Sequence, residues 1–199
     1  FDARGAETLL WLFQQYLEKG NGSSVSNGIP SNAPAHLSEW KKKFIAGRNV
    51  NRKIVALSKT PPETLPIPSD KNKGFKFKLI SFNQHETQTI HDNAYREAGY
   101  LMETPYLLAA VIQAMNDLFR KRGLTADSFL ASVNIDMRTG ENINQELFFN
   151  HVSYIFYQVP SDIMDNPKEI MTSIKIQMYE QVKAGIPRDI MEASHLTRI

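Results

Sequence analysis

Two predicted strands stand between two predicted helices, and this order restricts the fold more than any other feature of the chain. Residues 129–138 carry apolar side chains at the odd positions from Phe129 to Met137, while the even positions from Ser132 to Arg138 are polar. An alternation with a period of two predicts a strand with one polar face. Residues 151–160 predict a second strand, which follows the turn sequence TGEN and ends in a proline.

The helix predicted before the strands covers residues 104–123. Thr104 is the predicted N-cap, Pro105 suits the first turn, and Gly123 is the predicted end of the helix. The apolar positions recur every three or four residues, as in a helix with one buried face. They are Leu108, Val111, Ile112, Met115, Leu118 and Phe119.

The helix predicted after the strands covers residues 165–185. Asp165 or Asn166 is the predicted cap, and Pro167 lies inside the first turn. Its apolar stripe consists of Met171, Ile174, Met178 and Val182. A further short helix is expected after residue 185, and the sequence predicts an α/β protein with layered helices and strands.

Upstream of these elements, residues 75–82 read FKFKLISF and predict another strand, with lysines on its polar face. Residues 83–99 predict a helix. Asn83 is the expected N-cap, Glu86 occupies the capping-box position three residues later, and Gly99 is the expected stop.

The N-terminal third of the chain contains one clear helical pattern, at residues 4–18. Its apolar stripe is wide, which predicts burial on more than one side. Residues 21–36 are rich in Gly, Ser, Asn and Pro, and four prolines follow at residues 61–68. Between residues 21 and 72 we expect no regular element except a short helix at 37–46, so this stretch is either a linker or a functional loop.

Composition excludes several classes of protein. The 199 residues contain no Cys, which excludes disulfides, Cys metal sites and Cys nucleophiles and favours a reducing, cytoplasmic environment. The formal net charge of +2 gives no indication of nucleic-acid binding. No apolar run reaches the roughly 18 residues of a membrane span, and no signal-peptide pattern is present.

The stretch that follows residue 36 is strongly basic, with Lys41, Lys42 and Lys43 in succession. A run of this kind is usually a solvated surface. The alternative is contact with phosphate groups or with the surface of an anionic membrane, so that these three lysines would make a peripheral membrane contact.

Local motifs assign no reaction to the chain. Walker A, G-x-G-x-x-G, G-x-S-x-G and H-E-x-x-H sequences are absent. His85 and His91 are six residues apart on one predicted helix, which does not place both on one metal, and no metal site is expected. Asp136 and Arg138 are expected to pair with each other or with a neighbour, and His151 to be a polar residue at a strand end.

The order of segments in residues 75–184 resembles the second half of the CoA-dependent acyltransferase superfamily, which includes chloramphenicol acetyltransferase, condensation domains and wax ester synthases. A helix containing Leu108-Ala109-Ala110-Val111 is followed by a strand ending in VNIDMR, then by FFNHVSYIFYQVP and by a helix that opens with DNPKEIM. The superfamily motif H-H-x-x-x-D precedes a helix, and Phe1-Asp2 resemble its last two positions.

The resemblance implies an incomplete layered α/β sandwich of the chloramphenicol-acetyltransferase type. Residues 1–20 would end the first lobe, residues 21–74 would be a crossover linker, and residues 75–199 would form a C-terminally truncated second lobe. The general base of the motif, a His, would lie upstream of Phe1. Asp2 is then the motif Asp that supports the site, and Asn150 and Arg138 are the candidate substrate-binding residues.

The implied reaction is transfer of an acyl group from a CoA or carrier-protein thioester to an alcohol or amine. The acyl thioester is a co-substrate, the acceptor is a small molecule or a lipid, and no bound cofactor is expected. The alternative is a scaffold or interaction domain that keeps the fold without the chemistry. Two His residues upstream of Phe1 would favour the enzyme, and the 199-residue chain alone is expected to be inactive because it lacks the general base.

Overall fold

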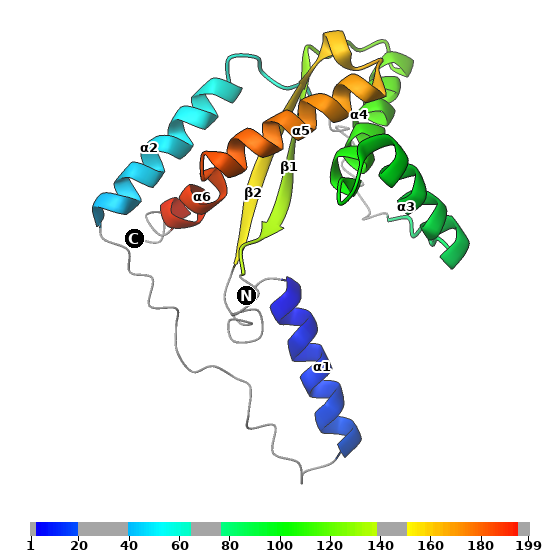
Figure 1. Cartoon of the computed structure of the whole chain (residues 1–199), viewed down its shortest axis with the longest axis vertical. Helices are drawn as coiled ribbons and strands as arrows, with labels where there is room; N and C mark the ends of the chain where they lie inside the picture. Colours follow the sequence, from blue (N-terminus) through cyan, green and yellow to red (C-terminus); the bar gives the residue numbers. More distant parts are fainter. Residues whose placement is uncertain (1–2, 20–39, 65–76, 139–150, 195–199) are drawn as a thin grey trace, which may run out of the picture. The chain divides into compact units, whose positions relative to one another are not determined.

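The computed structural model describes residues 3–19, 40–64, 77–138 and 151–194 (Figure 1). Within these ranges the protein is mixed α/β, with six α-helices and one sheet of two antiparallel strands, which confirms the predicted α/β class. The elements are α1 (Ala3–Lys19), α2 (Trp40–Leu57), α3 (Gln84–Ala98), α4 (Glu103–Lys121), β1 (Ser128–Asp136), β2 (Val152–Pro160), the short 3-10 helix η2 (Ser161–Ile163), α5 (Pro167–Lys183) and α6 (Ile186–Ser194).

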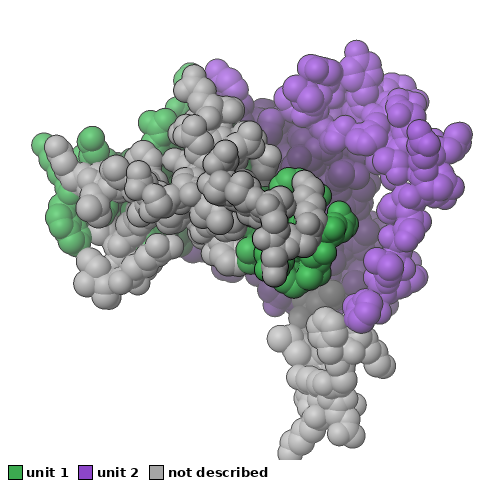
Figure 2. Space-filling model, turned by 90° about the horizontal axis from the view of Figure 1, so that it is seen from below, with its two compact units in different colours: residues 1–54, 132–155, 181–199 green, residues 55–131, 156–180 purple. Residues whose placement is uncertain are grey.

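The chain divides into two compact units, which Figure 2 shows in different colours. Unit 1 comprises residues 1–54, 132–155 and 181–199, and unit 2 comprises residues 55–131 and 156–180. Each unit is assembled from separate stretches of sequence. The predicted division of the chain at residues 20 and 74 stays a prediction.

The strands β1 and β2 pair without a bulge. The backbone N–H of Ser161 donates to Asp127 at one end of the ladder, and that of Met137 donates to His151 at the other, at 2.9 Å in both cases. Ten residues separate the two bonds on each strand, so the register is constant between them. In this register the backbone groups of the odd-numbered residues face the partner strand.

The predicted alternation of β1 is confirmed. Ser132, Asn134 and Asp136 are exposed, whereas Phe129 is buried on the other face. In unit 2 the ring of Phe129 meets the ring of Phe119 from α4 edge to face, with centroids 5.0 Å apart. The core of unit 2 continues through fully buried side chains of β2 and α5, namely Tyr157, Val159, Ile170 and Ile174.

The starts of two helices follow the predicted capping chemistry. Asn83 accepts from the N–H of Glu86 at 2.9 Å while the Glu86 carboxylate accepts from the N–H of Asn83 at 2.8 Å, which is the predicted capping box of α3. Gly99 ends α3 with a φ of 102°, in the region that favours glycine. At α5 the cap is Asn166, whose side-chain oxygen accepts from the N–H of Lys168 at 3.1 Å.

The predicted N-cap of α4 is wrong. The helix begins at Glu103, and the preceding Met102 makes no side-chain capping bond. Thr104 therefore lies inside the first turn. Pro105 is buried at the third helical position, where its missing N–H costs nothing because the first N–H groups of a helix have no intrahelical acceptor.

The strand predicted at residues 75–82 is wrong for the part that the structure describes. Residues 77–83 have no regular secondary structure, and the large apolar side chains Phe77, Leu79, Ile80 and Phe82 are all exposed. An alternating pattern produces a strand only where a neighbouring strand takes up its backbone hydrogen bonds and one face is covered. The described sheet contains β1 and β2 alone.

The short helix predicted at residues 37–46 is much longer. α2 runs from Trp40 to Leu57 and ends shortly before Pro61. Ala46 and Leu57 are buried, so packing holds a helix that its weak apolar periodicity did not indicate. The part of the chain at residues 40–57 that was expected to be linker is therefore helical.

The helix predicted at residues 4–18 is confirmed as α1, but its predicted burial on several sides is wrong. Six large side chains in α1 are exposed, and they are Leu9, Leu10, Trp11, Phe13, Tyr16 and Leu17. The width of the stripe reflects apolar residues that no described part of the chain covers. Across the described ranges, no helix has both the length and the apolar character needed to cross a membrane.

Candidate functional site

One of the three predicted site residues lies in the part of the chain that the structure describes. Arg138 lies two residues after the end of β1, in unit 1. Asp2 and Asn150 lie outside the described residues, as do the predicted turn at 139–142 and the Gly/Ser-rich stretch at 21–36. That Asp2, Arg138 and Asn150 form one site therefore stays a prediction from the sequence.

Arg138 and Asp136 form the ion pair that their spacing predicted. Arg138 Nη1 lies 3.0 Å from Asp136 Oδ1, and the backbone N–H of Arg138 donates to the same oxygen at 3.0 Å. The Arg138 side chain is only 1% exposed, whereas that of Asp136 is 37% exposed. The carboxylate therefore fixes both the chain direction after β1 and the position of a buried guanidinium.

The pair consists of a charged donor group that already binds a carboxylate oxygen. A guanidinium has five N–H donors in a rigid plane and stays protonated at every physiological pH. Holding it in place beforehand reduces the side-chain entropy lost when a carboxylate or phosphate binds. It offers neither a nucleophile nor a general base, so Arg138 cannot by itself activate a substrate.

His151 lies at the same end of the sheet and is 6% exposed. It is directly opposite Met137, whose N–H donates to the His151 carbonyl at 2.9 Å. The buried imidazole thus stands at the start of β2, near the end of β1 that leads into Arg138. Sequence analysis treated His151 only as a polar strand end, because a single His beside a strand carries no signal of burial.

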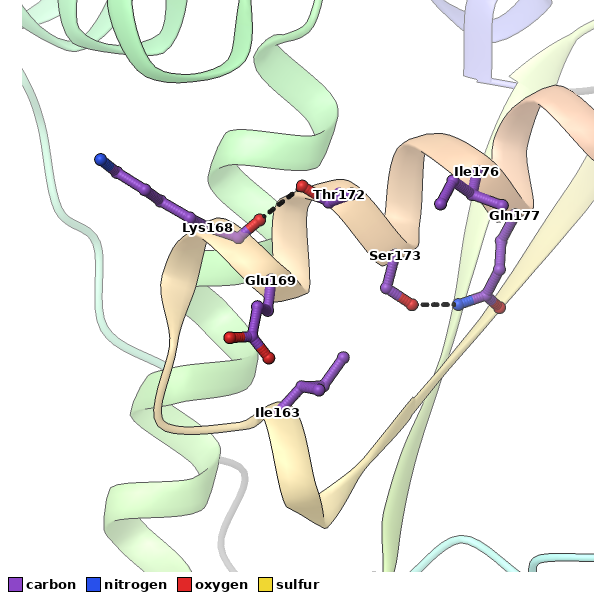
Figure 3. A pocket seen from close by; sticks show the side chains of 7 residues that line it. All are labelled: Ile163, Lys168, Glu169, Thr172, Ser173, Ile176 and Gln177. Carbon is purple, nitrogen blue, oxygen red and sulfur yellow. Dashed lines mark hydrogen bonds between the residues drawn. The ribbon is translucent and has the colours of Figure 1, made fainter.

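A groove of about 410 Å³ runs along α5 in unit 2 (Figure 3). Most of its lining comes from one face of α5, between Lys168 and Gln177, with Ile163 at its lower edge. The polar side chains in the groove bond within the chain: Thr172 Oγ1 donates to the Lys168 carbonyl at 2.8 Å, and Gln177 donates to Ser173 Oγ at 3.1 Å. None of the three predicted site residues lines this groove.

A polar network in unit 2, built on Gln158 and Gln177, was not predicted from the sequence. The Gln158 N–H donates to Gln177 Oε1 and the Gln177 Nε2 donates to the Gln158 carbonyl, both at 2.9 Å. These backbone groups face away from β1, so the Gln177 amide takes the place of a third strand at the edge of β2. A glutamine in a helix stripe gives no sign of such a role.

The side chain of Gln158 ties the segment after α2 to the sheet. Its Nε2 lies 2.5 Å from the Thr60 carbonyl, 3.1 Å from the Leu57 carbonyl and 3.2 Å from Ser128 Oγ. Two amide protons shared among three acceptors leave no capacity for a ligand. The network is therefore structural, although it has the composition of a small polar site.

Three electrostatic features complete unit 2. Arg120 Nη2 donates to Asp165 Oδ2 at 2.6 Å, and this hydrogen bond lowers the pKa of Asp165 and raises that of Arg120. Burial raises the pKa of Tyr157, whose side chain lies in the core. His91 Nδ1 and Glu103 Oε1 are 2.5 Å apart on the exposed surfaces of α3 and α4. No cluster of three metal-ligating residues occurs in the described ranges.

Comparisons with protein-family models, with curated protein sequences and with solved structures give no match to this chain. The acyltransferase resemblance therefore depends on the ordered segments of the sequence alone.

Proposed function

We propose that this chain is part of an acyltransferase of the CoA-dependent superfamily, with the layered sandwich that the resemblance implies. The enzyme transfers an acyl group from a CoA or carrier-protein thioester to an alcohol or amine. The observation that carries the proposal is the order α4, β1, β2, α5, with Arg138 two residues after β1, Pro160 at the end of β2 and Pro167 at the start of α5. This is the order of segments on which the resemblance is based.

In this proposal Arg138 positions a substrate and Asp136 holds Arg138 in place. The support is the geometry of a buried guanidinium bound to one carboxylate oxygen at 3.0 Å. Asp2 supports the catalytic motif and Asn150 contacts substrate, as the resemblance implies. The general base is the motif His that the superfamily places before the residues matching Phe1-Asp2, and it deprotonates the acceptor hydroxyl or amine.

The test compares the chain with a version extended upstream by the segment that precedes Phe1 in its gene. Release of free CoA from acyl-CoA is measured with and without an acceptor alcohol or amine. We expect no acceptor-dependent release from residues 1–199 and measurable release from the extended protein, because loss of a general base costs roughly 10²–10⁴-fold. If the upstream segment lacks the two His residues, or if the extended protein is inactive, the scaffold alternative replaces the proposal.

The role of Arg138 is tested in the extended protein by Arg138→Gln, with Arg122→Gln as the matched control. Arg122 is an exposed arginine at the end of α4. If Arg138 positions the acyl thioester, Arg138→Gln should raise the KM for the thioester and the control should leave it unchanged. Equal kinetics in both variants at equal stability would remove Arg138 from the site.

A further inference from the structure

Helix α2 concentrates the positive charge of the chain. Its 18 residues contain six of the 23 Lys and Arg residues and no Asp or Glu, whereas the whole chain has a formal net charge of only +2. The positive potential near α2 is therefore a local property of this helix. A local field of this kind attracts an anionic surface without making the whole protein cationic.

The N-terminal end of α2 presents an exposed aromatic pair. Trp40 and Phe44 are one helical turn apart, their ring centroids are 6.3 Å apart, and they are 58% and 68% exposed. The Nζ of Lys43 lies 5.8 Å from the centroid of the Trp40 ring. Large aromatic side chains left in water lose the favourable free energy that burial would give.

A row of cations lies beside this pair. At 100° per residue, Trp40, Phe44, Arg48, Lys41 and Arg52 fall in that order within an arc of about 120°. All five are exposed. Ile45, which is 51% exposed, lies at the far side of the same row.

The opposite side of α2 is the one that packs. Ala46 is 2% exposed and Leu57 is 9% exposed, and both lie well outside the arc of aromatic and cationic side chains. The helix therefore has separate inward and outward faces. The outward face is the one on which the aromatic pair, the row of cations and Ile45 lie side by side.

We propose that this outward face of α2 binds the surface of an anionic lipid membrane. Trp40, Phe44 and Ile45 enter the boundary between headgroups and acyl chains, and Lys41, Arg48 and Arg52 contact the lipid phosphates and carboxylates. Helices with this combination of aromatic, aliphatic and cationic side chains lie in the plane of the membrane surface. A nucleic acid would satisfy the cations but would give the aliphatic Ile45 no apolar environment, which is why we infer lipid.

The helical structure also changes which residues are expected to contact the membrane. The run Lys41-Lys42-Lys43 does not act as one patch, because successive residues of a helix point in directions 100° apart. Lys41 belongs to the cationic row, and Lys43 lies against the Trp40 ring. Lys42 lies outside the arc, so its neutralisation is expected to weaken membrane binding less than that of Lys41.

Vesicle binding of the 199-residue chain tests the proposal, with vesicles of phosphatidylcholine alone and of phosphatidylcholine with phosphatidylserine. We expect binding only to the vesicles with phosphatidylserine, and weaker binding as salt rises because the screening length shortens. Each cation near an anionic surface contributes about fivefold in affinity, so the triple variant Lys41→Gln/Arg48→Gln/Arg52→Gln should bind about 100-fold more weakly. The matched control neutralises three exposed cations of unit 2 and should bind normally; it is Lys121→Gln/Arg122→Gln/Lys168→Gln.

Tryptophan fluorescence tests the aromatic contact independently. The chain has two Trp residues, so Trp11→Phe leaves Trp40 as the sole reporter. We expect its emission to shift to the blue on addition of anionic vesicles and to be quenched by brominated acyl chains. The double variant Trp40→Ser/Phe44→Ser should lose vesicle binding while its far-UV circular dichroism stays that of the parent chain.

Three outcomes would overturn the proposal. The first is absence of binding to vesicles that contain phosphatidylserine. The second is binding that the triple variant and the unit 2 control weaken equally, since charge alone would then explain it. The third is that vesicles cause no shift of Trp40 emission while the α2 face binds something else. That would be shown by tight binding of a DNA or RNA oligonucleotide, or by self-association that the variant Trp40→Ser/Phe44→Ser loses.

Discussion

Gln177 offers a direct measure of what a side-chain amide contributes at a sheet edge. Its amide makes two hydrogen bonds of 2.9 Å with the N–H and carbonyl groups of Gln158. Each intramolecular hydrogen bond contributes about 1 kcal/mol net, so Gln177→Ala should destabilise the protein by about 2 kcal/mol. In a chain of this length that lowers Tm by about 4–8 °C.

Urea unfolding and thermal melts of the 199-residue chain measure this difference. Glu180→Ala is the matched control, because Glu180 is exposed on the same helix. The two variants change helix propensity in the same direction and differ in the bonds to Gln158. If Gln177→Ala and Glu180→Ala agree within about 0.5 kcal/mol, the Gln177 amide does not stabilise the edge of β2 and the reasoning is refuted.

Gln177→Glu separates the donor from the acceptor. A carboxylate still accepts from the Gln158 N–H but cannot donate to its carbonyl, and at neutral pH its charge faces that carbonyl oxygen. The neutral carboxylic acid can donate, so the folded state raises the pKa of this introduced Glu. The penalty of Gln177→Glu relative to the parent chain should therefore shrink as pH falls through that raised pKa. A penalty independent of pH would contradict the assigned direction of the two bonds.

Three further predictions concern local structure. Asn83→Ala removes the side-chain half of the capping box and should cost about 0.5–2 kcal/mol, measured by urea unfolding against the exposed control Gln88→Ala. Ile174→Ala opens a cavity at a position that is 0% exposed and should cost about 2–5 kcal/mol in the same assay. Arg120 lowers the pKa of Asp165, so this pair stabilises the fold at pH values above the ordinary Asp pKa. The stabilisation is lost as pH falls through the lowered pKa, and Asp165→Asn should therefore flatten that part of the pH dependence of the urea midpoint.

The sequence predicted those elements whose signals are local. The capping box of Asn83 and Glu86 involves residues three positions apart, and the alternation of β1 depends on one neighbouring strand that follows soon in the chain. Asn166 was one of two predicted caps for α5, and the carboxylate of the other, Asp165, instead binds Arg120, a residue 45 positions away. A pattern confined to a few neighbouring residues predicts the structure correctly when no contact with distant residues overrides it.

The errors occurred where distant residues decide the outcome. Residues 77–82 have a good strand pattern but no strand partner in the described part of the chain, whereas residues 40–57 have an ambiguous pattern and form a long helix. The Gln158 network joins residues separated by 19, 30 and 98 positions. Of the candidate site, the Arg138–Asp136 pair was predictable from its spacing, but the burial of its guanidinium was not.

α1 and α2 both expose large apolar side chains, and their charges distinguish what can cover them. The exposed face of α2 carries cations beside its aromatic residues, so an anionic and partly apolar surface complements it. α1 exposes Leu, Phe and Trp side chains without an excess of cations, because Arg4 and Lys19 offset Glu7 and Glu18. The proposed acyltransferase gives α1 a different cover, because the resemblance places this helix in the first lobe, where an apolar stripe packs against neighbouring protein. The two helices therefore call for different partners although their hydrophobic exposure is similar.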